Sequence, residues 1–470
     1  MPKIKSKKKV LFCAAEATPL AKVGGLADVV GSLPAALKSQ QIEARVLMPA
    51  HGSIMWRGLR AKSIATFYVV IGGQRERVVV REVRVQGVHY YLLVNKKYFS
   101  GNVYDGDNIS KYLFFCRAAL VALSYLPFRP AVIHAHDFHA APIITELAVR
   151  KRRPGLILTI HNLQHQGWTD ITTLKAFGFQ ETSFLGRVNL GKDNQTVNLL
   201  AAGIATADKI TTVSATYARE ILTSAYGQGL DKLLRSRRRD LVGIVNGIDV
   251  NDYNPETDRW LVDNYTSLNL TAGKQVNKKA VFSYFGWQED GSPLLVFIAR
   301  FSSQKGLDLF AETAWRQLAQ RYAFKLVLLG SGEKKYENIA LSLQSALPAN
   351  IRTVVAFDNA LARNLYAAAD YFLVPSQFEP CGLTQMMAMR YGAVPIVRAT
   401  GGLKDTVKHG QTGLTFSTYT IPAFTKIVEQ ALRLYYRQPK KFQALRLAGR
   451  RQDWSWSASA PAYRRLYDLV

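Results

Sequence analysis

A loop with a single carboxylate, between an apolar run and a group of strong helix formers, is the stretch best suited to chemistry. Residues 375–385 carry Glu379, follow the apolar run 371–374, and precede the helix formers 386–389. This order predicts a strand, a tight loop and a helix N-terminus. The N–H groups of residues 382–384 would lack partners within that helix and would carry its positive dipole end. The loop therefore suits a phosphate and a hydroxyl-rich group attached to it, although a capped surface helix would have the same local pattern.

Glycine turns with a nearby cation occur after other predicted strands. Lys22, Gly24 and Gly25 follow the first apolar run of the chain, and a helical pattern begins directly after them. Glycines allow the backbone to approach a phosphate closely, and a lysine adds a point charge. A further glycine turn, residues 400–407, again follows a strand-like run. Each turn alone is a weak signal, because a plain strand-to-helix turn looks the same, but together they favour a diphosphate-bearing ligand.

Two cations follow the apolar run 294–299. Arg300 stands at its end, and Lys305 comes five residues later, before a glycine. Two cations at the carboxyl end of a strand can neutralise a departing diphosphate. Taken by themselves they could equally be solvated charges beside a loop.

Histidines gather at two other predicted strand ends. His134, His136, Asp137 and His139 lie close together, and His161 follows the apolar run 156–160. Such residues can bind zinc. However, His134 and His136 alternate along a strand, and no flanking Cys or Glu completes a ligand set. The pattern therefore favours polar contacts to sugar hydroxyls, or an orienting Asp137–His pair, over a metal site.

Strand-like and helix-like segments alternate through both halves of the chain. This alternation predicts mostly parallel sheets covered by helices, with ligands beyond the carboxyl ends of the strands. Turn residues 246–255 mark the linker between two doubly wound domains. The predicted strands are residues 10–15, 45–48, 66–71, 77–85, 88–94, 131–135, 156–160, 294–299, 325–329, 352–356, 371–374 and 394–397.

Composition bounds the class of protein. The chain has 470 residues, of which 48% are hydrophobic and 20% charged, as in an ordinary globular protein. The lysine-rich start, residues 1–9, is not followed by a long apolar segment, so we expect neither a signal peptide nor a membrane span. Three widely spaced cysteines favour a reducing cytoplasm. The net charge of +27 would attract polyanions, but no nucleic-acid-binding motif accompanies it, and a basic solvated surface is the preferred interpretation.

An ordered set of motifs resembles the bacterial glycogen synthases and plant starch synthases. The set extends from near residue 10 to Asp453–Trp456 and therefore covers nearly the whole chain. The motifs are Lys22-Val23-Gly24-Gly25-Leu26, residues 134–139, 159–163, 213–218 and 246–249, Arg300 with residues 304–306, and residues 375–385.

The resemblance implies a GT-B fold, with two Rossmann-like doubly wound domains facing each other across a deep cleft. It implies retaining transfer of glucose from ADP-glucose to the non-reducing end of an α-1,4-glucan, with neither metal nor cofactor. The implied catalytic residues are Asp137, His161, Arg300, Lys305 and Glu379. The implied substrate-binding residues are Lys22, Gly24, Gly25, Asp28, Asn162, Asn246, Cys381, Gly382, Leu383 and Thr384.

We therefore expect an acceptor-side domain over residues 1–248, a sugar-nucleotide domain over residues 249–453, and a helix at 454–470 that returns to the first domain. ADP-glucose and glycogen are the expected partners, in the cytoplasm, without nucleic acid or membrane. Two alternatives stay open: a related GT-B glucosyltransferase that uses UDP-glucose or another acceptor, and a catalytically silent glucan- or polyanion-binding protein.

Overall fold

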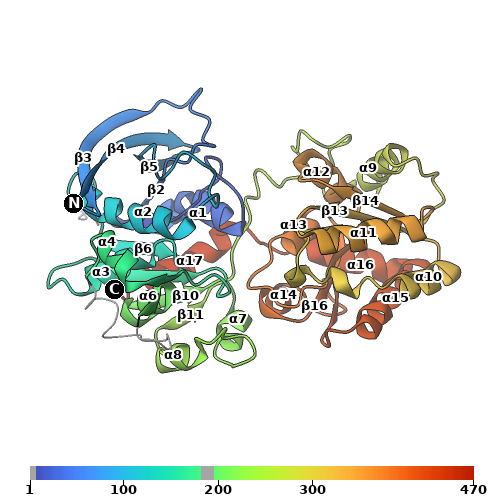
Figure 1. Cartoon of the computed structure of the whole chain (residues 1–470). Coiled ribbons are helices and arrows are strands. Elements are labelled where there is room, and N and C mark those ends of the chain that lie inside the picture. The colour runs from blue at the N-terminus through green and yellow to red at the C-terminus, as the bar shows by residue number, and fades with distance from the viewer. Residues whose placement is uncertain (1–6, 181–194) are drawn as a thin grey trace. The chain divides into compact units, whose positions relative to one another are not determined.

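The computed structural model describes residues 7–180 and 195–470. The first six residues of the lysine-rich start lie outside the described residues. The chain forms two compact units, one of Met1–Gly247 with Ser455–Val470 and one of Ile248–Trp454 (Figure 1).

The first unit is built on a nine-stranded sheet, counted over the described residues, in the order β11-β10-β7-β6-β1-β2-β5-β4-β3. The strands from β11 to β5 pair in parallel, whereas β4 and β3 are antiparallel additions at one edge. A separate pair, β8 (Trp168–Asp170) and β9 (Thr196–Asn198), is antiparallel. The strands of the large sheet are β1 (Lys8–Cys13), β2 (Ile42–Pro49), β3 (Lys62–Ile71), β4 (Gln74–Val85), β5 (Val88–Val94), β6 (Val132–His136), β7 (Gly155–Ile160), β10 (Lys209–Thr212) and β11 (Leu241–Gly243).

The helices of this unit lie between its strands in the sequence, except the last. Helix α17 comes from the end of the chain and contacts α1 and η1. The helices are α1 (Gly25–Ala36), η1 (Leu37–Gln40), α2 (Asn108–Ala122), α3 (Ala141–Ala148), α4 (Ile171–Ala176), α6 (Leu199–Thr206), α7 (Ala215–Glu220), α8 (Asp231–Ser236) and α17 (Trp456–Tyr467).

The second unit holds an all-parallel sheet in the order β14-β13-β12-β15-β16-β17. Its central strands are continuous apolar runs because both faces are buried. The strands are β12 (Leu294–Ile298), β13 (Lys325–Gly330), β14 (Ile351–Val355), β15 (Tyr371–Val374), β16 (Val394–Arg398) and β17 (Leu414–Phe416). The helices are α9 (Leu270–Tyr284), η2 (Ser303–Lys305), η3 (Leu307–Leu309), α10 (Glu312–Arg321), α11 (Lys334–Ala346), α12 (Asn359–Ala368), α13 (Thr384–Arg390), α14 (Gly401–Thr406), α15 (Ile421–Arg437) and α16 (Pro439–Arg450). None of the helices in the described residues is long and apolar enough to cross a membrane.

Both sheets reverse their strand order at one point, and the predicted pair of doubly wound sheets is thereby confirmed. In the first unit the chain goes from β1 to β2 on one side and later to β6 on the other. In the second unit the same reversal occurs between β12 and β15. Loops that leave the carboxyl ends of strands at such a switch point diverge, and the crevice between them is the usual ligand site of doubly wound sheets.

Candidate functional site

The switch point of the second unit brings together the loops after β12 and β15. The first loop carries Arg300 and Lys305, and the second carries Glu379. The Lys305 ammonium lies 2.7 Å from Oε2 of Glu379, whose side chain is 8% exposed. The hydroxyl of the fully buried Ser376 donates to the same oxygen at 2.8 Å. A buried carboxylate held by a cation and a hydroxyl is fixed in position and can orient a polar ligand group.

Main-chain bonds and close packing hold these two loops to each other. The Gln377 backbone N–H donates to the Gln304 carbonyl at 2.8 Å, and the side-chain Nε2 of Gln304 donates to the Phe378 carbonyl at 3.1 Å. Gly306 has a φ of +81°, and a Cβ there would lie 2.3 Å from the Pro375 carbonyl oxygen. Only glycine combines this backbone conformation with so close an approach.

Arg300 differs from Lys305 in its surroundings. It is exposed, and its guanidinium forms no ion pair with any residue in the described part of the chain. It lies two residues beyond the end of β12. The switch point thus offers one cation that is paired with a carboxylate and one whose charge is uncompensated, which is suitable for an anionic ligand.

The segment between Glu379 and α13 is tightly folded. Cys381 is buried, Gly382 has a φ of +72°, and Leu383 is the N-cap residue of α13, which begins at Thr384. The side-chain amide of Gln385 donates to the Gly382 carbonyl at 2.7 Å and to the Thr406 hydroxyl at 3.0 Å. These bonds fix the backbone of the segment next to the Lys305–Glu379 pair.

The switch point of the first unit lies between β1 and β6, and the turn after β1 is organised by a carboxylate. Glu16 accepts hydrogen bonds from the N–H groups of Val23 at 2.5 Å and Gly24 at 3.1 Å. The Tyr104 hydroxyl donates to its other oxygen at 3.1 Å. Burial raises the pKa of Glu16 against the lowering effect of these bonds. Two N–H groups of the predicted phosphate turn are therefore already occupied by a protein carboxylate.

Lys22, Gly25 and Asp28 surround this turn. The Lys22 ammonium lies 2.6 Å from Oδ1 of Asp28, with the two side chains 38% and 19% exposed. Gly24 is the N-cap of α1, and Gly25 is its first residue. The turn thus presents a lysine at the start of a helix, as the sequence predicts.

Asp137 and His161 directly follow the neighbouring parallel strands β6 and β7. The backbone N–H of His161 donates to Oδ1 of Asp137 at 2.7 Å. Asp137 has a φ of +55°, a conformation that side-chain-bearing residues seldom adopt and that is often found at functional sites. Burial raises the pKa of Asp137 to about 7, although the N–H groups of His161 and Asn162 oppose the shift. Burial lowers the pKa of His161 to about 3, so its imidazole is neutral at physiological pH.

The remaining histidines form a buried network. His136 and His161 share a hydrogen bond of 2.9 Å, and His134 bonds the hydroxyls of Thr159 at 2.6 Å and Tyr467 at 2.8 Å. Burial lowers the pKa of both His134 and His136. Over residues 7–180 and 195–470, no three His, Cys, Asp or Glu side chains are grouped as a metal site would need.

Two asparagines complete the predicted set. Asn162 accepts the N–H of Gln164 at 3.1 Å and so shapes the turn after His161. Asn246 is buried, and its side-chain oxygen has no hydrogen-bond partner among the described residues. A buried acceptor without a partner suits a ligand that supplies a donor.

Glu16 and Tyr104 were not predicted as site residues from the sequence. Glu16 is an acidic residue directly after an apolar strand, six residues before Lys22, and this position could have indicated it. Tyr104 lies 88 residues away along the chain from its partner, and only the fold brings the two together.

Comparison with known proteins agrees with this architecture. Residues 9–236 match the starch synthase catalytic domain, and residues 285–450 match glycosyl transferases group 1. Glycogen synthase of Geobacillus stearothermophilus is 38% identical, with 98% of each chain covered. Glycogen synthase of Moorella thermoacetica is 40% identical, with 98% of this chain and 96% of that protein covered.

Solved structures give the same result. The catalytic domain of starch synthase IV from Arabidopsis thaliana, bound to ADP and acarbose, matches with a TM-score of 0.91 and 30% identity over 98% of this chain and 99% of that one. Sucrose-phosphate synthase from Thermosynechococcus elongatus, at 16% identity and a TM-score of 0.63, shares the fold. The chain therefore belongs to the glycogen synthase and starch synthase family of two-domain GT-B glycosyltransferases, whose activity is the synthesis of glycogen or starch.

Proposed function

We propose that the enzyme transfers glucose from ADP-glucose to the non-reducing end of an α-1,4-glucan with retention of configuration. The observation that carries the proposal is the Lys305–Glu379 pair at the switch point of the second unit. Arg300, on the same loop as Lys305, forms no ion pair with any described residue. A glucosyl diphosphate needs both kinds of group: cations for the leaving group and a fixed carboxylate for the sugar.

The leaving group is the part of the donor that these cations serve. As the bond between glucose C1 and the β-phosphate oxygen breaks, negative charge grows on the diphosphate. Arg300 and Lys305 would stabilise this charge more strongly in the transition state than in the bound donor, which is the condition for a higher rate. Backbone groups of Cys381, Gly382, Leu383 and Thr384 would contact the sugar and phosphates.

The sugar would be positioned by groups that remain fixed during the reaction. Glu379, Asp137, Asn246 and the neutral His161 would bond its hydroxyls, and Lys22 with Gly24 and Gly25 would contact the phosphates or the sugar beside them. An acceptor hydroxyl would then attack an oxocarbenium-like C1 from the face that the diphosphate leaves, and its proton would pass to the diphosphate. No metal ion or cofactor takes part in this scheme.

One solved relative supports ADP-glucose as the proposed donor. The Arabidopsis starch synthase IV domain binds ADP and acarbose, a nucleotide and an oligosaccharide analogue that correspond to the two proposed substrates. UDP-glucose is the second candidate donor. The three buried cysteines form no disulfide in the described part of the chain, which supports a reducing cytoplasm as the place of action.

The test is incorporation of labelled glucose into glycogen from ADP-glucose and, separately, from UDP-glucose. We expect strong preference for ADP-glucose and α-1,4-linked product that an α-1,4-specific glucanase releases completely. Preference for UDP-glucose would contradict the donor assignment, and failure of folded protein to use either donor would contradict the transferase assignment.

A further inference from the structure

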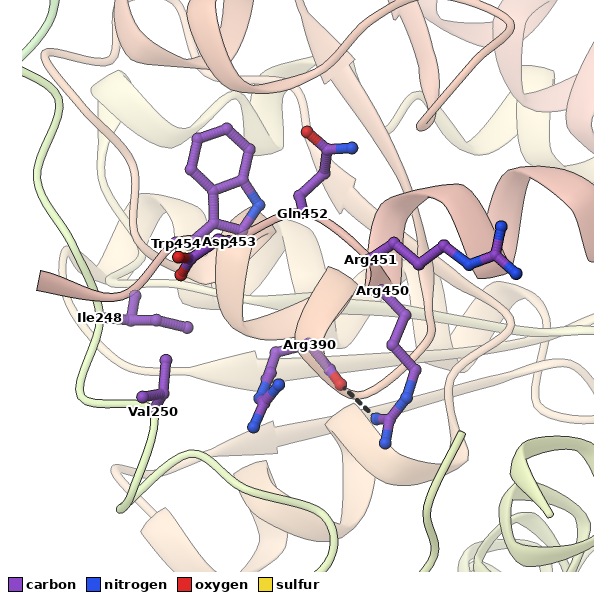
Figure 2. A pocket seen from close by; sticks show the side chains of 8 residues that line it. All are labelled: Ile248, Val250, Arg390, Arg450, Arg451, Gln452, Asp453 and Trp454. Carbon is purple, nitrogen blue, oxygen red and sulfur yellow. Dashed lines mark hydrogen bonds between the residues drawn. The ribbon is translucent and has the colours of Figure 1, made fainter. Parts of the chain in front are cut away.

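A small cavity lies in the second unit where the chain enters and leaves that unit. Its volume is about 180 Å³, and its walls include Ile248, Arg390, Arg450, Arg451, Asp453 and Trp454 (Figure 2). Ile248 and Trp454 are the first and last residues of the unit, and the N–H of Ile248 donates to the Trp454 carbonyl at 2.7 Å. The residues assigned to glucosyl transfer are not among those that line this cavity.

Arg450 is a buried cation in the wall, with only 6% of the residue exposed. Its guanidinium donates to the Arg390 carbonyl at 2.7 Å, the Ser267 hydroxyl at 3.1 Å and Glu256 at 3.4 Å. A guanidinium has five N–H bonds, so these partners leave part of its donor capacity unused. The bond to Arg390 is the one drawn in Figure 2.

Two further N–H groups of the wall are buried without an acceptor. They are Nε of Arg390 and the indole Nε1 of Trp454, neither of which has a partner in the part of the chain that the structure describes. Leaving a buried donor unpaired costs about 1–3 kcal/mol. Arginines at the ends of α13 and α16 are favourable for the helix dipoles, but that role does not account for unpaired donors on two separate segments.

The residues that line the cavity carry a net positive charge, which favours an anion, as the N–H donors without acceptors do. Arg390, Arg450 and Arg451 contribute three positive charges, and Asp453 contributes one negative charge. Figure 2 shows the Arg451 side chain extending away from Arg390 and Arg450. Burial and, to a smaller extent, the charge of Arg390 lower the pKa of Arg450, whereas Tyr265 and Glu256 oppose the shift. A bound anion would act in the same direction as Glu256.

We propose that this cavity is an oxyanion site that binds a phosphate group, separate from the site of glucosyl transfer. The volume corresponds to roughly six water molecules, which suits a phosphate and is small for a drug-sized ligand. Arg390, Arg450 and the Trp454 indole would donate to its oxygens. The bound anion would connect the ends of α13 and α16 with the segment that leaves the unit at Trp454.

The probe is inorganic phosphate, titrated into the full-length protein by calorimetry at a constant ionic strength of about 0.15 M. Two variants remove donors from the wall: Arg390→Met removes a cation, and Trp454→Phe removes one N–H while keeping most of the ring. The control is Arg433→Met, which removes an arginine of α15 whose side chain is 51% exposed. Unchanged thermal unfolding in the absence of phosphate shows that each variant is folded.

We expect one phosphate-binding event that Arg433→Met retains, that Trp454→Phe weakens about tenfold, and that Arg390→Met weakens more. Any phosphate binding at Arg300 and Lys305 would be unchanged in both wall variants. Only the binding that is weakened in these variants is therefore assigned to the cavity. Absence of binding, or equal affinity in all four proteins, would overturn the proposal. Because neither donor nor glucan is present, the result is independent of the transferase activity.

The phosphate could be the free ion or part of a small phosphate monoester. Glycerol 3-phosphate, titrated in parallel, distinguishes the two sources. Tighter binding than inorganic phosphate, lost in Arg390→Met, would assign a monoester, and binding that is no tighter would assign the free ion.

Discussion

Three buried carboxylates have different partners, and their proposed roles follow from those partners. Glu379 faces a lysine and a hydroxyl, Glu16 faces two backbone N–H groups and a phenol, and Asp137 faces the N–H of His161. Burial raises the pKa of both Glu16 and Asp137. A raised pKa means that burial destabilises the ionised form of the carboxylate. A carboxylate in such an environment is a candidate for a functional role.

Asp137→Asn should make the enzyme more stable and inactive. The pKa of Asp137 is raised from 3.8 to about 7, so its stabilising contribution is full below about pH 4 and is lost as pH rises through 7. An asparagine has no such dependence, can still accept the His161 N–H, and tolerates a positive φ. We expect the free energy of unfolding at pH 8 to rise by up to about 4 kcal/mol relative to the parent, and by much less at pH 5. A loss of stability that is equal at both pH values in denaturant titrations would contradict the assigned environment.

Glu16→Ala should impair use of the sugar donor because it frees the turn that carries Lys22. Asp107→Ala is a matched control, since Asp107 also accepts two backbone N–H groups, at the N-cap of α2. Both variants should lose roughly 1–2 kcal/mol of unfolding free energy. Steady-state kinetics should show kcat/KM for ADP-glucose at least about tenfold lower in Glu16→Ala only. Equal kinetics in the two variants would show that the turn does not serve the donor.

At the scale of elements, the proposed site residues of each unit lie on loops that leave strands at a switch point. Gly306 is an example of a tightly constrained position in such a loop, because its φ is positive and a Cβ there would lie 2.3 Å from the Pro375 carbonyl oxygen. Gly410 also has a positive φ, of +70°, but a Cβ there would meet nothing within 4 Å. Substitutions at Gly306 and Gly410 therefore distinguish two effects: both positions have a positive φ, but only Gly306 is sterically crowded.

Gly306→Ala should therefore cost more than Gly410→Ala. Both variants incur the strain of a left-handed alanine, about 1 kcal/mol, and only Gly306→Ala must also displace the loop that bears Glu379. We expect a larger fall in the denaturation midpoint and a large loss of transferase activity for Gly306→Ala, with near-parental activity for Gly410→Ala. Similar activities in the two variants would mean that the loop tolerates displacement.

Strands that form buried apolar runs could be predicted from the sequence, and most short strands could not. The strands predicted at residues 88–94 and 371–374 coincide with β5 and β15, because apolar runs bounded by turn residues are unambiguous. The short strands β8, β9, β10, β11 and β17 were not predicted, since three or four residues are too few to show a period. The carboxyl-end residues Arg300, Lys305 and Glu379 could be assigned to one end of a sheet, but the 2.7 Å contact between Lys305 and Glu379 depends on packing of the two loops. The partners of Glu16 are set by tertiary structure in the same way.

At the scale of the whole molecule, the two units are built on the same plan, but the first unit is completed by the end of the chain. Tyr467 of α17 is fully buried, and its hydroxyl bonds His134 of β6, 333 residues away. The backbone carbonyl of Tyr467 also accepts a hydrogen bond from Lys8 of β1. The central strands of the first unit are therefore held partly by the last helix.

Tyr467→Ala should destabilise the first unit by about 3–5 kcal/mol, the usual cost of deleting a buried aromatic ring. Tyr436→Ala is the control, because Tyr436 lies on α15 of the second unit and is 44% exposed. Limited proteolysis followed by mass spectrometry should place the new cleavage sites of Tyr467→Ala within residues 1–247. New sites mainly within residues 248–454 would contradict the assignment of α17 to the first unit.

The most direct test of the proposed reaction centre is the initial rate of glucose transfer from ADP-glucose to glycogen in Lys305→Ala and Lys334→Ala. Both lysines lie 2.7 Å from a glutamate whose side chain is 8% exposed, but only Lys305 belongs to the switch point. We predict a fall in kcat of at least about a hundredfold for Lys305→Ala and a rate close to the parent's for Lys334→Ala, with both proteins folded. A folded Lys305→Ala enzyme that transfers glucose as fast as the control would contradict the role of this lysine and of the site built around it.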